Sequence, residues 1–329
     1  MKKIDRVHAA VRCEEVDRIP FGLWLHNFTR ENTARELADE TIRLYTTYGW
    51  DLVKPQSRPY CFSQMWGLRY APSNSVAVWP TVEHFPVRTV QEFAALEPVP
   101  VKPGTALYEQ IEAFGMTRDA IGHDVPIIAT IFAPIMVAAF MLPNGMADVV
   151  RFMTEAPDEF EKGLSAISVT LAEYAMKCRD AGTDGIFYAT TVANAHLMTE
   201  DQFETFQKPL DLTILNAAPG PLDILHMCGD EILFDSFADY PAPILSWAAN
   251  GMNPSLKEAH TRTGKAVMGG LPGKPAMGAM TVDDVLQRAR ESLREMGGRF
   301  HILGPDCSIN PDTPAETLAA ITHFMTARE

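Results

Sequence analysis

The sequence of 329 residues lacks the short motifs that mark several large enzyme classes. No Gly-x-Gly-x-x-Gly follows a predicted strand, no Walker-type phosphate loop occurs, and no Gly-x-Ser-x-Gly nucleophile elbow is present. Runs rich in Gly and Ser, Pro-rich tracts and charge blocks, which mark linkers, are also missing. These absences exclude the Rossmann, P-loop and α/β-hydrolase scaffolds, and they predict a single domain over residues 1–329.

Positive charge is scarce, because 28 Lys and Arg residues stand against 42 Asp and Glu residues and the formal net charge is −14. Nucleic acids and anionic membrane surfaces both attract basic patches, so this balance argues against either as a partner. Apolar runs such as Val125–Phe132 are too short to span a bilayer. The first residues contain no apolar core of the signal-peptide kind, so we expect a cytoplasmic protein without a membrane partner.

Cysteine is sparse and widely spaced, which argues against a disulfide framework. The five residues are Cys13, Cys61, Cys178, Cys228 and Cys307. Cys13 and Cys178 fall in helical patterns, where cysteine behaves as a small apolar residue. Cys61 lies in an aromatic-rich stretch and could approach a binding site. Cys228 and Cys307 both follow predicted strands, so metal binding or catalysis is the first question to ask of them.

Short, continuous apolar or β-branched runs alternate with helical patterns along the chain, as is typical of parallel strands buried on both faces. They predict eight strands, at Ile19–Leu25, Asp51–Lys54, Val125–Phe132, Gly185–Thr190, Leu222–Met227, Pro243–Trp247, Ala266–Gly270 and Phe300–Gly304. Predicted helices include Asp158–Ala181, Thr199–Asn216, Thr281–Met296 and Thr313–Thr326. This alternation favours an α/β fold of the closed (β/α)8 TIM-barrel type, with an open doubly wound sheet as the alternative.

The region 60–87 does not fit the alternation. It contains two turn signals, Ala71-Pro72-Ser73-Asn74 and Trp79-Pro80, and therefore predicts a β-hairpin inserted after the second strand. Its aromatic residues are Tyr60, Phe62, Trp66, Tyr70 and Trp79. They suit a lid over a flat or apolar substrate, and they equally suit a contact between two copies of the chain in a homodimer.

The most specific pattern joins His226, Cys228 and Cys307. His226 and Cys228 are two residues apart at the end of the fifth predicted strand, so their side chains point to the same face. Cys307 follows the eighth predicted strand, and the C-terminal ends of barrel strands carry active sites. One histidine and two cysteines leave a fourth zinc position open, as catalytic zinc sites do. The alternative is a core histidine with satisfied nitrogens and two cysteines that act as small apolar residues.

Further residues at or near predicted strand ends are candidates for substrate binding. They are Trp24, His26, Lys54, Tyr188, Asn194 and Trp247. Trp24 and Trp247 could instead be core aromatic residues, and Lys54 a solvated charge at the rim. Asp306 and Glu231 are candidates for a fourth zinc ligand in the substrate-free protein, although acids beside turns are more often caps.

Several segments, spread over nearly the whole chain, resemble the uroporphyrinogen decarboxylase superfamily. They are Asp17-Arg18-Ile19-Pro20, Gly49-Trp50-Asp51-Leu52-Val53-Lys54, Asp180-Ala181-Gly182-Thr183-Asp184-Gly185, Gly269-Gly270, Gly304-Pro305-Asp306-Cys307 and Pro311-Asp312-Thr313-Pro314. Within this superfamily the chain looks like the zinc-dependent, corrinoid-linked methyltransferase branch, which carries its zinc on His-x-Cys and a late Cys. Those positions match His226, Cys228 and Cys307.

The resemblance implies a Zn²⁺ enzyme that transfers a methyl group to or from a corrinoid (methylcobalamin) held by a separate corrinoid protein. The other substrate would be a small thiol acceptor or a methyl donor, such as a methyl ether, that undergoes demethylation. The decarboxylases carry Arg-Gln-Ala-Gly-Arg after strand 1, where this chain has Trp24-Leu25-His26-Asn27-Phe28-Thr29-Arg30. Since those arginines grip the porphyrinogen carboxylates, a porphyrinogen decarboxylase is only the alternative. A noncatalytic zinc-binding sensor barrel is an alternative of another class.

Overall fold

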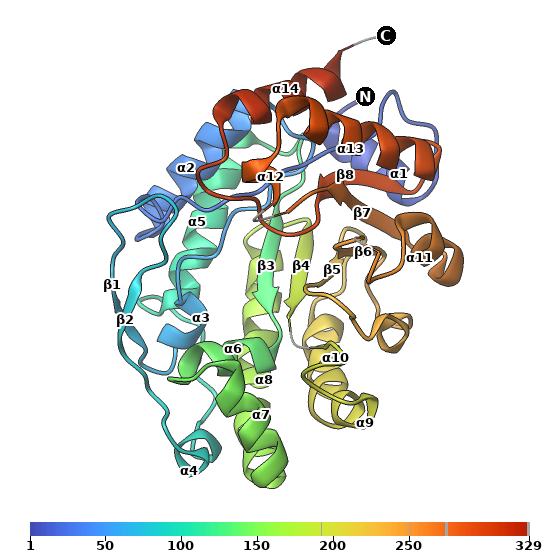
Figure 1. The fold of residues 1–329 in the computed structure, drawn as a ribbon. Helices are drawn as coiled ribbons and strands as arrows, with labels where there is room; N and C mark the ends of the chain where they lie inside the picture. The colour runs from blue at the N-terminus through green and yellow to red at the C-terminus, as the bar shows by residue number, and fades with distance from the viewer. Residues whose placement is uncertain (192, 250, 274–275, 328–329) are drawn as a thin grey trace.

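The computed structural model describes residues 1–191, 193–249, 251–273 and 276–327 (Figure 1). Within these ranges a parallel sheet of six strands runs through the centre in the order β3-β4-β5-β6-β7-β8. Its strands are β3 (Ile128–Phe132), β4 (Gly185–Thr190), β5 (Ile224–Met227), β6 (Ile244–Trp247), β7 (Ala266–Leu271) and β8 (His301–Pro305). Neighbours in this sheet are neighbours in sequence, without the reversal of strand order that a doubly wound sheet requires.

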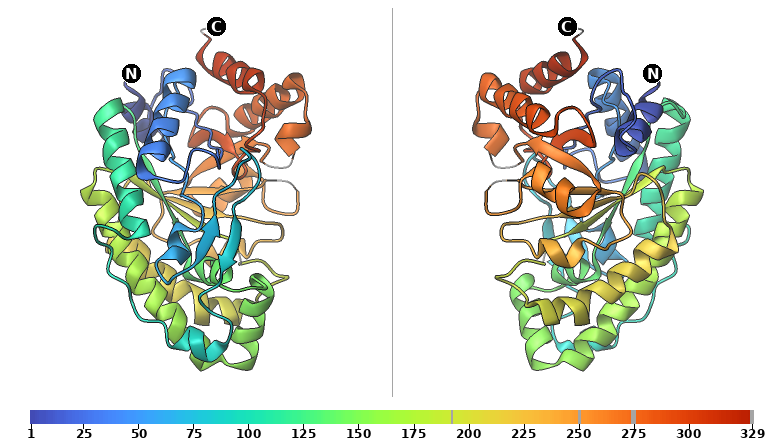
Figure 2. Two further views of the ribbon diagram at one scale, coloured as in Figure 1. Left: turned by 90° about the vertical axis from the view of Figure 1, so that its left-hand side faces the viewer. Right: turned by 90° about the vertical axis from the view of Figure 1, so that its right-hand side faces the viewer.

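Helices connect the strands and cover the outside of the sheet, and both chain ends lie at the same end of the molecule (Figures 1 and 2). The α-helices are α1 (Lys3–Val11), α2 (Ala34–Tyr48), α3 (Cys61–Gln64), α4 (Val90–Ala94), α5 (Ala106–Ile121), α6 (Pro134–Met141), α7 (Met146–Glu155), α8 (Pro157–Asp180), α9 (Glu200–Gln202), α10 (Lys208–Ala217), α11 (Leu256–Thr263), α12 (Ala276–Ala279), α13 (Val282–Met296) and α14 (Ala315–Thr326). A π-helix η1 (Phe203–Gln207) and a 3-10 helix η2 (Phe234–Phe237) complete the helical layer. Because this layer covers the sheet, β4, β5 and β6 are buried along their whole length.

In the ranges that the structure describes, no single helix is both long and apolar enough to cross a membrane. Helices α6 and α7 reach the required length and composition together, but only as a pair bent by 111°.

Two predicted helices change near prolines. The stretch Thr199–Asn216, predicted as one helix, is divided into α9, η1 and α10. Pro209 has no N–H to donate and its ring crowds the preceding turn, so the wider π turn before it relieves both problems. The last helix begins later than predicted, because Pro314 is its N-cap residue and Thr313 Oγ1 donates to a loop carbonyl instead.

The segments predicted as the first two strands form isolated parallel bridges instead of continuous ladders, two in the first segment and one in the second. Phe21 bridges Leu303 of β8, and Val53 bridges Ile127, which directly precedes β3. A backbone hydrogen bond of 2.8 Å from Asp51 N to Phe21 O joins the two segments. Together they link one edge of the six-stranded sheet to the other.

Local chemistry accounts for the missing ladders at Ile19–Leu25 and Asp51–Lys54. Pro20 and Pro55 lie within or next to the two segments and have no N–H to donate to a ladder. The Leu52 side chain also packs against the backbone of Gly22, since a Cβ on Gly22 would lie 2.7 Å from Leu52 Cγ. The structure thus corrects the prediction of eight regular strands, because these two segments pair only at isolated positions.

The aromatic-rich region 60–87 contains a small antiparallel sheet of β1 (Arg69–Ala71) and β2 (Thr81–His84). Its rings rest on α6, the helix that follows β3. The ring centroids of Trp79 and Phe140 are 6.1 Å apart, and those of Tyr60 and Phe140 are 5.9 Å apart. The region is therefore anchored beside the C-terminal end of β3, where a binding site in a parallel sheet is expected.

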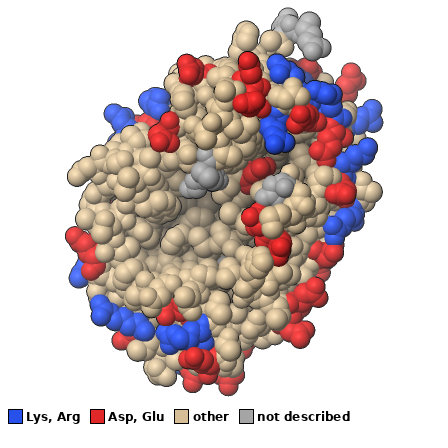
Figure 3. Space-filling model, in the orientation of Figure 1, with Lys and Arg blue, Asp and Glu red and all other residues tan. Residues whose placement is uncertain are grey.

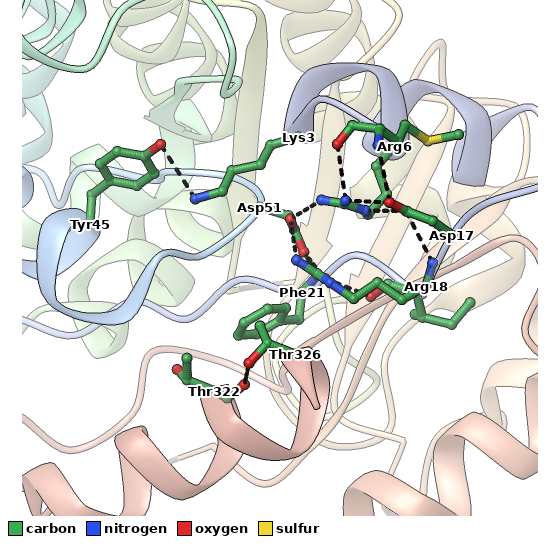
Figure 4. A network of polar contacts seen from close by, with 11 residues as sticks. Lys3, Arg6, Asp17, Arg18, Phe21, Tyr45, Asp51, Thr322 and Thr326 are labelled. Atoms are coloured by element: carbon green, nitrogen blue, oxygen red, sulfur yellow. Dashed lines mark hydrogen bonds and ion pairs between the residues drawn. The ribbon is translucent and has the colours of Figure 1, made fainter. Parts of the chain in front are cut away.

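A buried ion network ties the N-terminal segments together (Figure 4). The carboxylate of Asp51 is fully buried and accepts hydrogen bonds from Arg6 Nη1 at 2.7 Å, from Arg18 Nη2 at 2.9 Å and from Phe21 N at 3.1 Å. Asp17 accepts two further hydrogen bonds from Arg6 at 2.6 and 2.7 Å. The hydrogen bonds from Arg6 hold the pKa of Asp17 well below its usual range. The buried carboxylate of Asp51 therefore joins α1 to the segments around Arg18 and Phe21.

We predict that Asp51→Asn destabilises the protein by about 3–5 kcal/mol, because it leaves two guanidinium groups without their buried counter-charge. Chemical denaturation followed by circular dichroism measures this change in the free energy of unfolding. The control Glu15→Gln removes one exposed carboxylate of the same region and should change stability by less than about 0.5 kcal/mol. Equal effects of the two substitutions would contradict the role given to Asp51.

Candidate metal centre

Three side chains from two strand ends converge at one edge of the sheet. His226 lies in β5, Cys228 directly follows that strand, and Cys307 follows β8. The potential ligand atoms of the three residues all lie within 4.8 Å of one another. Among the described residues, no other group of three or more His, Cys, Asp and Glu side chains meets this distance. The structure brings together the three residues that the sequence singled out.

The two sulfur atoms are close without being bonded. Cys228 Sγ and Cys307 Sγ lie 3.7 Å apart, far beyond the roughly 2.05 Å of a disulfide bond. The hydrogen bond from Cys228, followed by the nearby ring of His226, lowers the pKa of the Cys307 thiol far below its usual value. This shift favours the thiolate form of Cys307, which is the form of cysteine that binds metals.

The ring of His226 is oriented by the neighbouring strand. Its Nδ1 lies 3.1 Å from Ser246 Oγ, and Ser246 is directly opposite His226 in the β5–β6 register. Its Nε2 is buried and has no hydrogen-bond partner among the described residues. A buried polar atom without a partner is costly, so an unpaired ring nitrogen beside two sulfur atoms fits a ligand position.

The structure places the two acids considered as a fourth ligand outside this group of three. Glu231 Oε2 lies 2.9 Å from His196 Nε2 in a half-exposed ion pair. Asp306 lines a different cavity together with Arg288 and Ser292, and burial raises the pKa of its carboxyl to about 7. The geometry therefore groups three potential metal ligands and includes neither acid among them.

A cavity of about 970 Å³, its open mouth included, is lined by His226, Cys228 and Cys307 and by many aromatic side chains. Three of the aromatic residues come from the region 60–87, namely Tyr60, Phe62 and Trp79. The other two aromatic residues predicted for a lid, Trp66 and Tyr70, are not part of the lining. On the face shown in Figure 3, the visible floor of the central hollow is uncharged, and acidic side chains lie along its right-hand margin. The cavity suits a substrate with a largely apolar body.

Trp24, His26 and Lys54 line this cavity. His26 Nδ1 lies 2.7 Å from a carboxylate oxygen of Glu31, which fixes the ring. Lys54 Nζ lies 4.6 Å from the ring centroid of Phe187 and 5.4 Å from that of Trp24. Burial lowers the pKa of Lys54 to about 7, so it is not the solvated rim charge of the alternative interpretation.

Tyr188, Asn194 and Trp247 lie outside the lining of the cavity. Tyr188 pairs with Leu225, not His226, so it points to the helical side, where its hydroxyl donates to Asp211. Trp247 is fully buried and its Nε1 donates to Pro254 O at 2.9 Å. Asn194 shapes a turn, since its Oδ1 accepts from the backbone N–H of His196. A position near a strand end does not by itself predict that a side chain lines the cavity, because alternate residues of a strand face opposite sides of the sheet.

Sequence reasoning missed much of the wall. The residues concerned are Gln56, Ser57, Arg58, Thr130, Phe132, Met136, Phe140, Phe187, Ala189, Thr191 and Ser308. The alternation of side chains along a strand could have identified two of them. Ala189 is opposite His226 in the parallel register, and Phe187, two residues before Ala189, lies on the same face of the sheet. Cys61 lies outside the lining, and burial raises the pKa of its thiol to about 12, so it is an inert core residue.

Known proteins resemble both the sequence and the fold. The profile of the family described as uroporphyrinogen decarboxylase (URO-D) matches residues 2–328. A methylcobamide:CoM methyltransferase (MtaA) of Methanosarcina barkeri is 26% identical over 226 residues, which is 64% of this chain and 61% of that protein. A uroporphyrinogen decarboxylase of Parasynechococcus marenigrum is 23% identical over 247 residues, covering 71% of this chain and 67% of that protein. The match to the methyltransferase thus spans about three fifths of its length.

A solved methyltransferase from Methanosarcina mazei superposes with a TM-score of 0.83 at 21% identity, covering 99% of this chain and 98% of that chain. This similarity shows a shared fold. The match of the family profile to nearly every residue confirms what the sequence motifs predicted: the chain belongs to the uroporphyrinogen decarboxylase (URO-D) family.

Proposed function

We propose that the protein is a zinc-dependent methyltransferase that moves a methyl group between a small substrate and a corrinoid held by a partner protein. The observation that carries this proposal is the unpaired, buried Nε2 of His226 beside the sulfur atoms of Cys228 and Cys307 in a cavity wall. Support comes from the similarity of this chain to methylcobamide:CoM methyltransferases.

The donor set fits zinc. Two thiolates and one neutral imidazole are its preferred ligands, and their two negative charges balance a divalent cation. Ser246 fixes the imidazole from behind, as residues around metal-binding histidines usually do. Three protein ligands with an open side toward a cavity are the arrangement of a catalytic site.

The residues of the chain then have distinct tasks. When bound, zinc would supply Lewis acidity toward a sulfur or oxygen atom of the substrate. His226, Cys228 and Cys307 hold that position at the cavity wall, and the aromatic side chains exclude water from the reacting atoms. In one direction, the sulfur of a substrate thiolate would bond to the methyl carbon while the bond from that carbon to the partner's corrinoid breaks, its electron pair staying with the corrinoid. In the other direction the methyl group leaves a donor oxygen or sulfur for the corrinoid of the partner.

The cavity disfavours the decarboxylase alternative. Porphyrinogens carry many carboxylates, whereas the described lining offers Lys and Arg side chains only at Lys54 and Arg58. A noncatalytic zinc sensor differs from the proposed enzyme in one measurable respect, because no thiol or methyl donor would perturb its metal.

The remaining parts of the proposal concern architecture and setting. Since the segments at Phe21 and Val53 bridge both edges of the sheet, we propose a closed (β/α)8 barrel that forms one domain over residues 1–329, with region 60–87 as a hairpin lid. The proposed setting is the cytoplasm, where a corrinoid protein would dock, and the aromatic lid leaves a homodimer contact open as a second role.

We predict about one zinc per chain in protein purified without a metal-affinity tag, and less than about a tenth of that in Cys228→Ser and Cys307→Ser. Serine keeps the size of the side chain but not the thiolate. Elemental analysis measures the zinc content. The control Cys13→Ser, which removes a thiol far from the cavity lining, should keep its zinc.

We predict that methyl-transfer activity depends on bound zinc. With methylcobalamin as a soluble corrinoid and a panel of thiols or methyl donors, zinc-loaded wild type should turn over. Cys307→Ser should lose at least about 100-fold in activity, since a ligand is worth more than the residues that orient it. Full zinc and full turnover in Cys307→Ser would overturn the proposed function.

A third prediction concerns Ser246. Ser246→Ala removes the hydroxyl that orients His226 and should weaken zinc binding by about 10- to 100-fold without abolishing it. Competition with a chromophoric chelator measures the affinity. Ser165→Ala, on the exposed face of α8, is the matched control and should bind zinc like wild type. An unchanged affinity in Ser246→Ala would show that this hydroxyl does not support the metal.

A further inference from the structure

One wall of the cavity consists of hydrogen-bond donors. The segment 54–58 contributes Lys54, Gln56, Ser57 and Arg58, and β3 contributes Thr130. Among the described residues of the lining, none is Asp or Glu, although the chain as a whole carries a net charge of −14. The electrostatic character of this wall is therefore opposite to that of the protein surface.

Many of these donors have no partner. Gln56 Nε2, Ser57 Oγ, Arg58 Nε and Thr130 Oγ1 are buried and make no hydrogen bond among the described residues. Each unsatisfied buried polar atom costs roughly 1–3 kcal/mol, and native structures keep such atoms mainly where a ligand or functional constraint explains them. Their concentration on one cavity wall points to a ligand that accepts hydrogen bonds.

Lys54 is the clearest case. It is 7% exposed, and its Nζ donates to Gln56 Oε1 at 3.3 Å, while no carboxylate of the described residues lies within ion-pair distance. It also faces the rings of Phe187 and Trp24, and the charges of Cys307 and Glu31 only partly offset its burial. Glu31, a nearby acid, is already bonded to His26 Nδ1 and to a backbone N–H. A buried ammonium group without a paired acid is costly until an anion binds beside it.

The wall is rigid. Gln110 Oε1 accepts a hydrogen bond from the backbone N–H of Arg58 at 3.0 Å, and Gln110 Nε2 donates to Gln56 O at 2.9 Å. One buried side chain therefore holds the backbone of segment 54–58 at two points. The guanidinium group of Arg58 also pairs with Glu109. The donors are therefore held in position before any ligand arrives, which lowers the entropic cost of binding.

The donor wall lies one aromatic ring away from the metal centre. Phe187 contacts Lys54 Nζ, at 4.6 Å from its centroid, and stacks on the ring of His226, with centroids 4.9 Å apart. Trp24 packs edge-on against Phe187 at 5.3 Å. A ligand that spans the cavity along Phe187 would meet donors at one end and His226 at the other.

We propose that this wall, with Lys54 at its centre, binds an oxyanion on the substrate, and that the substrate is a small aromatic carboxylate or sulfonate whose reacting group points toward His226. The inference deepens the proposed function and rests on it for the identity of the reacting group. The lining disfavours methylamines and other cationic donors, because a buried ammonium group would repel them.

Calorimetric titration of the purified protein tests the inference without any turnover. The probes are 3-methoxybenzoate, 3-methoxybenzenesulfonate and uncharged methoxybenzene. Wild type should bind at least one of the two anions about tenfold or more tightly than methoxybenzene, and the comparison of the anions separates carboxylate from sulfonate. Lys54→Met keeps the apolar stem and removes the charge, so it should weaken binding of the anion by about 10- to 100-fold. Lys102→Met, at an exposed position, is the control and should bind like wild type.

Thr130→Val, which keeps the shape and removes one donor, provides a second variant should Lys54→Met fail to fold, and it should weaken binding of the anion several-fold. Equal affinity for methoxybenzene and both anions in wild type, or equal affinity for the anions in wild type and a folded Lys54→Met, would overturn the inference. Zinc content measured on the same preparations separates the two proposals. Selective anion binding by a protein without zinc would support the donor wall and contradict the proposed zinc methyltransferase. Bound zinc without anion selectivity would support the zinc site and contradict the donor wall.

Discussion

The register of the parallel sheet is the constraint on which the proposed site depends. Because β5 and β6 pair with His226 opposite Ser246, the serine reaches one ring nitrogen and leaves the other for the cavity. Cys228 shares the face of His226 because it is two residues further along. Cys307 arrives from β8, and Gly273 lets it come close, since a Cβ there would lie 2.9 Å from Cys307 N. A slip of one residue in β5 would turn His226 toward the helices.

Charge inside the cavity is arranged around this constraint. Hydrogen bonding favours the thiolate of Cys307, and burial disfavours the ammonium form of Lys54, whose charge Cys307 and Glu31 partly support. In the proposed arrangement, Phe187 separates the sulfur-rich centre that would hold a metal from the donor wall that would bind a substrate oxyanion. Aromatic side chains around both keep the effective dielectric constant low, which strengthens each interaction.

Sequence reasoning identified the parts of the site whose geometry is local. The His-x-Cys spacing and the strand ends placed His226, Cys228 and Cys307 together, since a side-chain period of two and parallel strands determine both features. Tyr188 and Trp247 show the limit, because choosing the inward face of a strand requires its register. Arg58 and Thr130 were missed because segment 54–58 has no periodicity, and because nearly all of β3 is buried, so that burial does not mark the face of Thr130. The segments around Phe21 and Val53 read as strands, yet prolines and a close glycine contact confine their pairing to isolated bridges.

X-ray absorption at the zinc edge of the purified protein tests the central claim most directly, because it reports the ligands themselves. The account predicts two sulfur atoms at about 2.3 Å, one histidine nitrogen at about 2.0–2.1 Å and one exchangeable light atom at the open position. Addition of a thiol substrate should raise the sulfur count by about one, as an open position requires. A shell of oxygen and nitrogen atoms alone, or four protein ligands that no added thiol perturbs, would contradict the account.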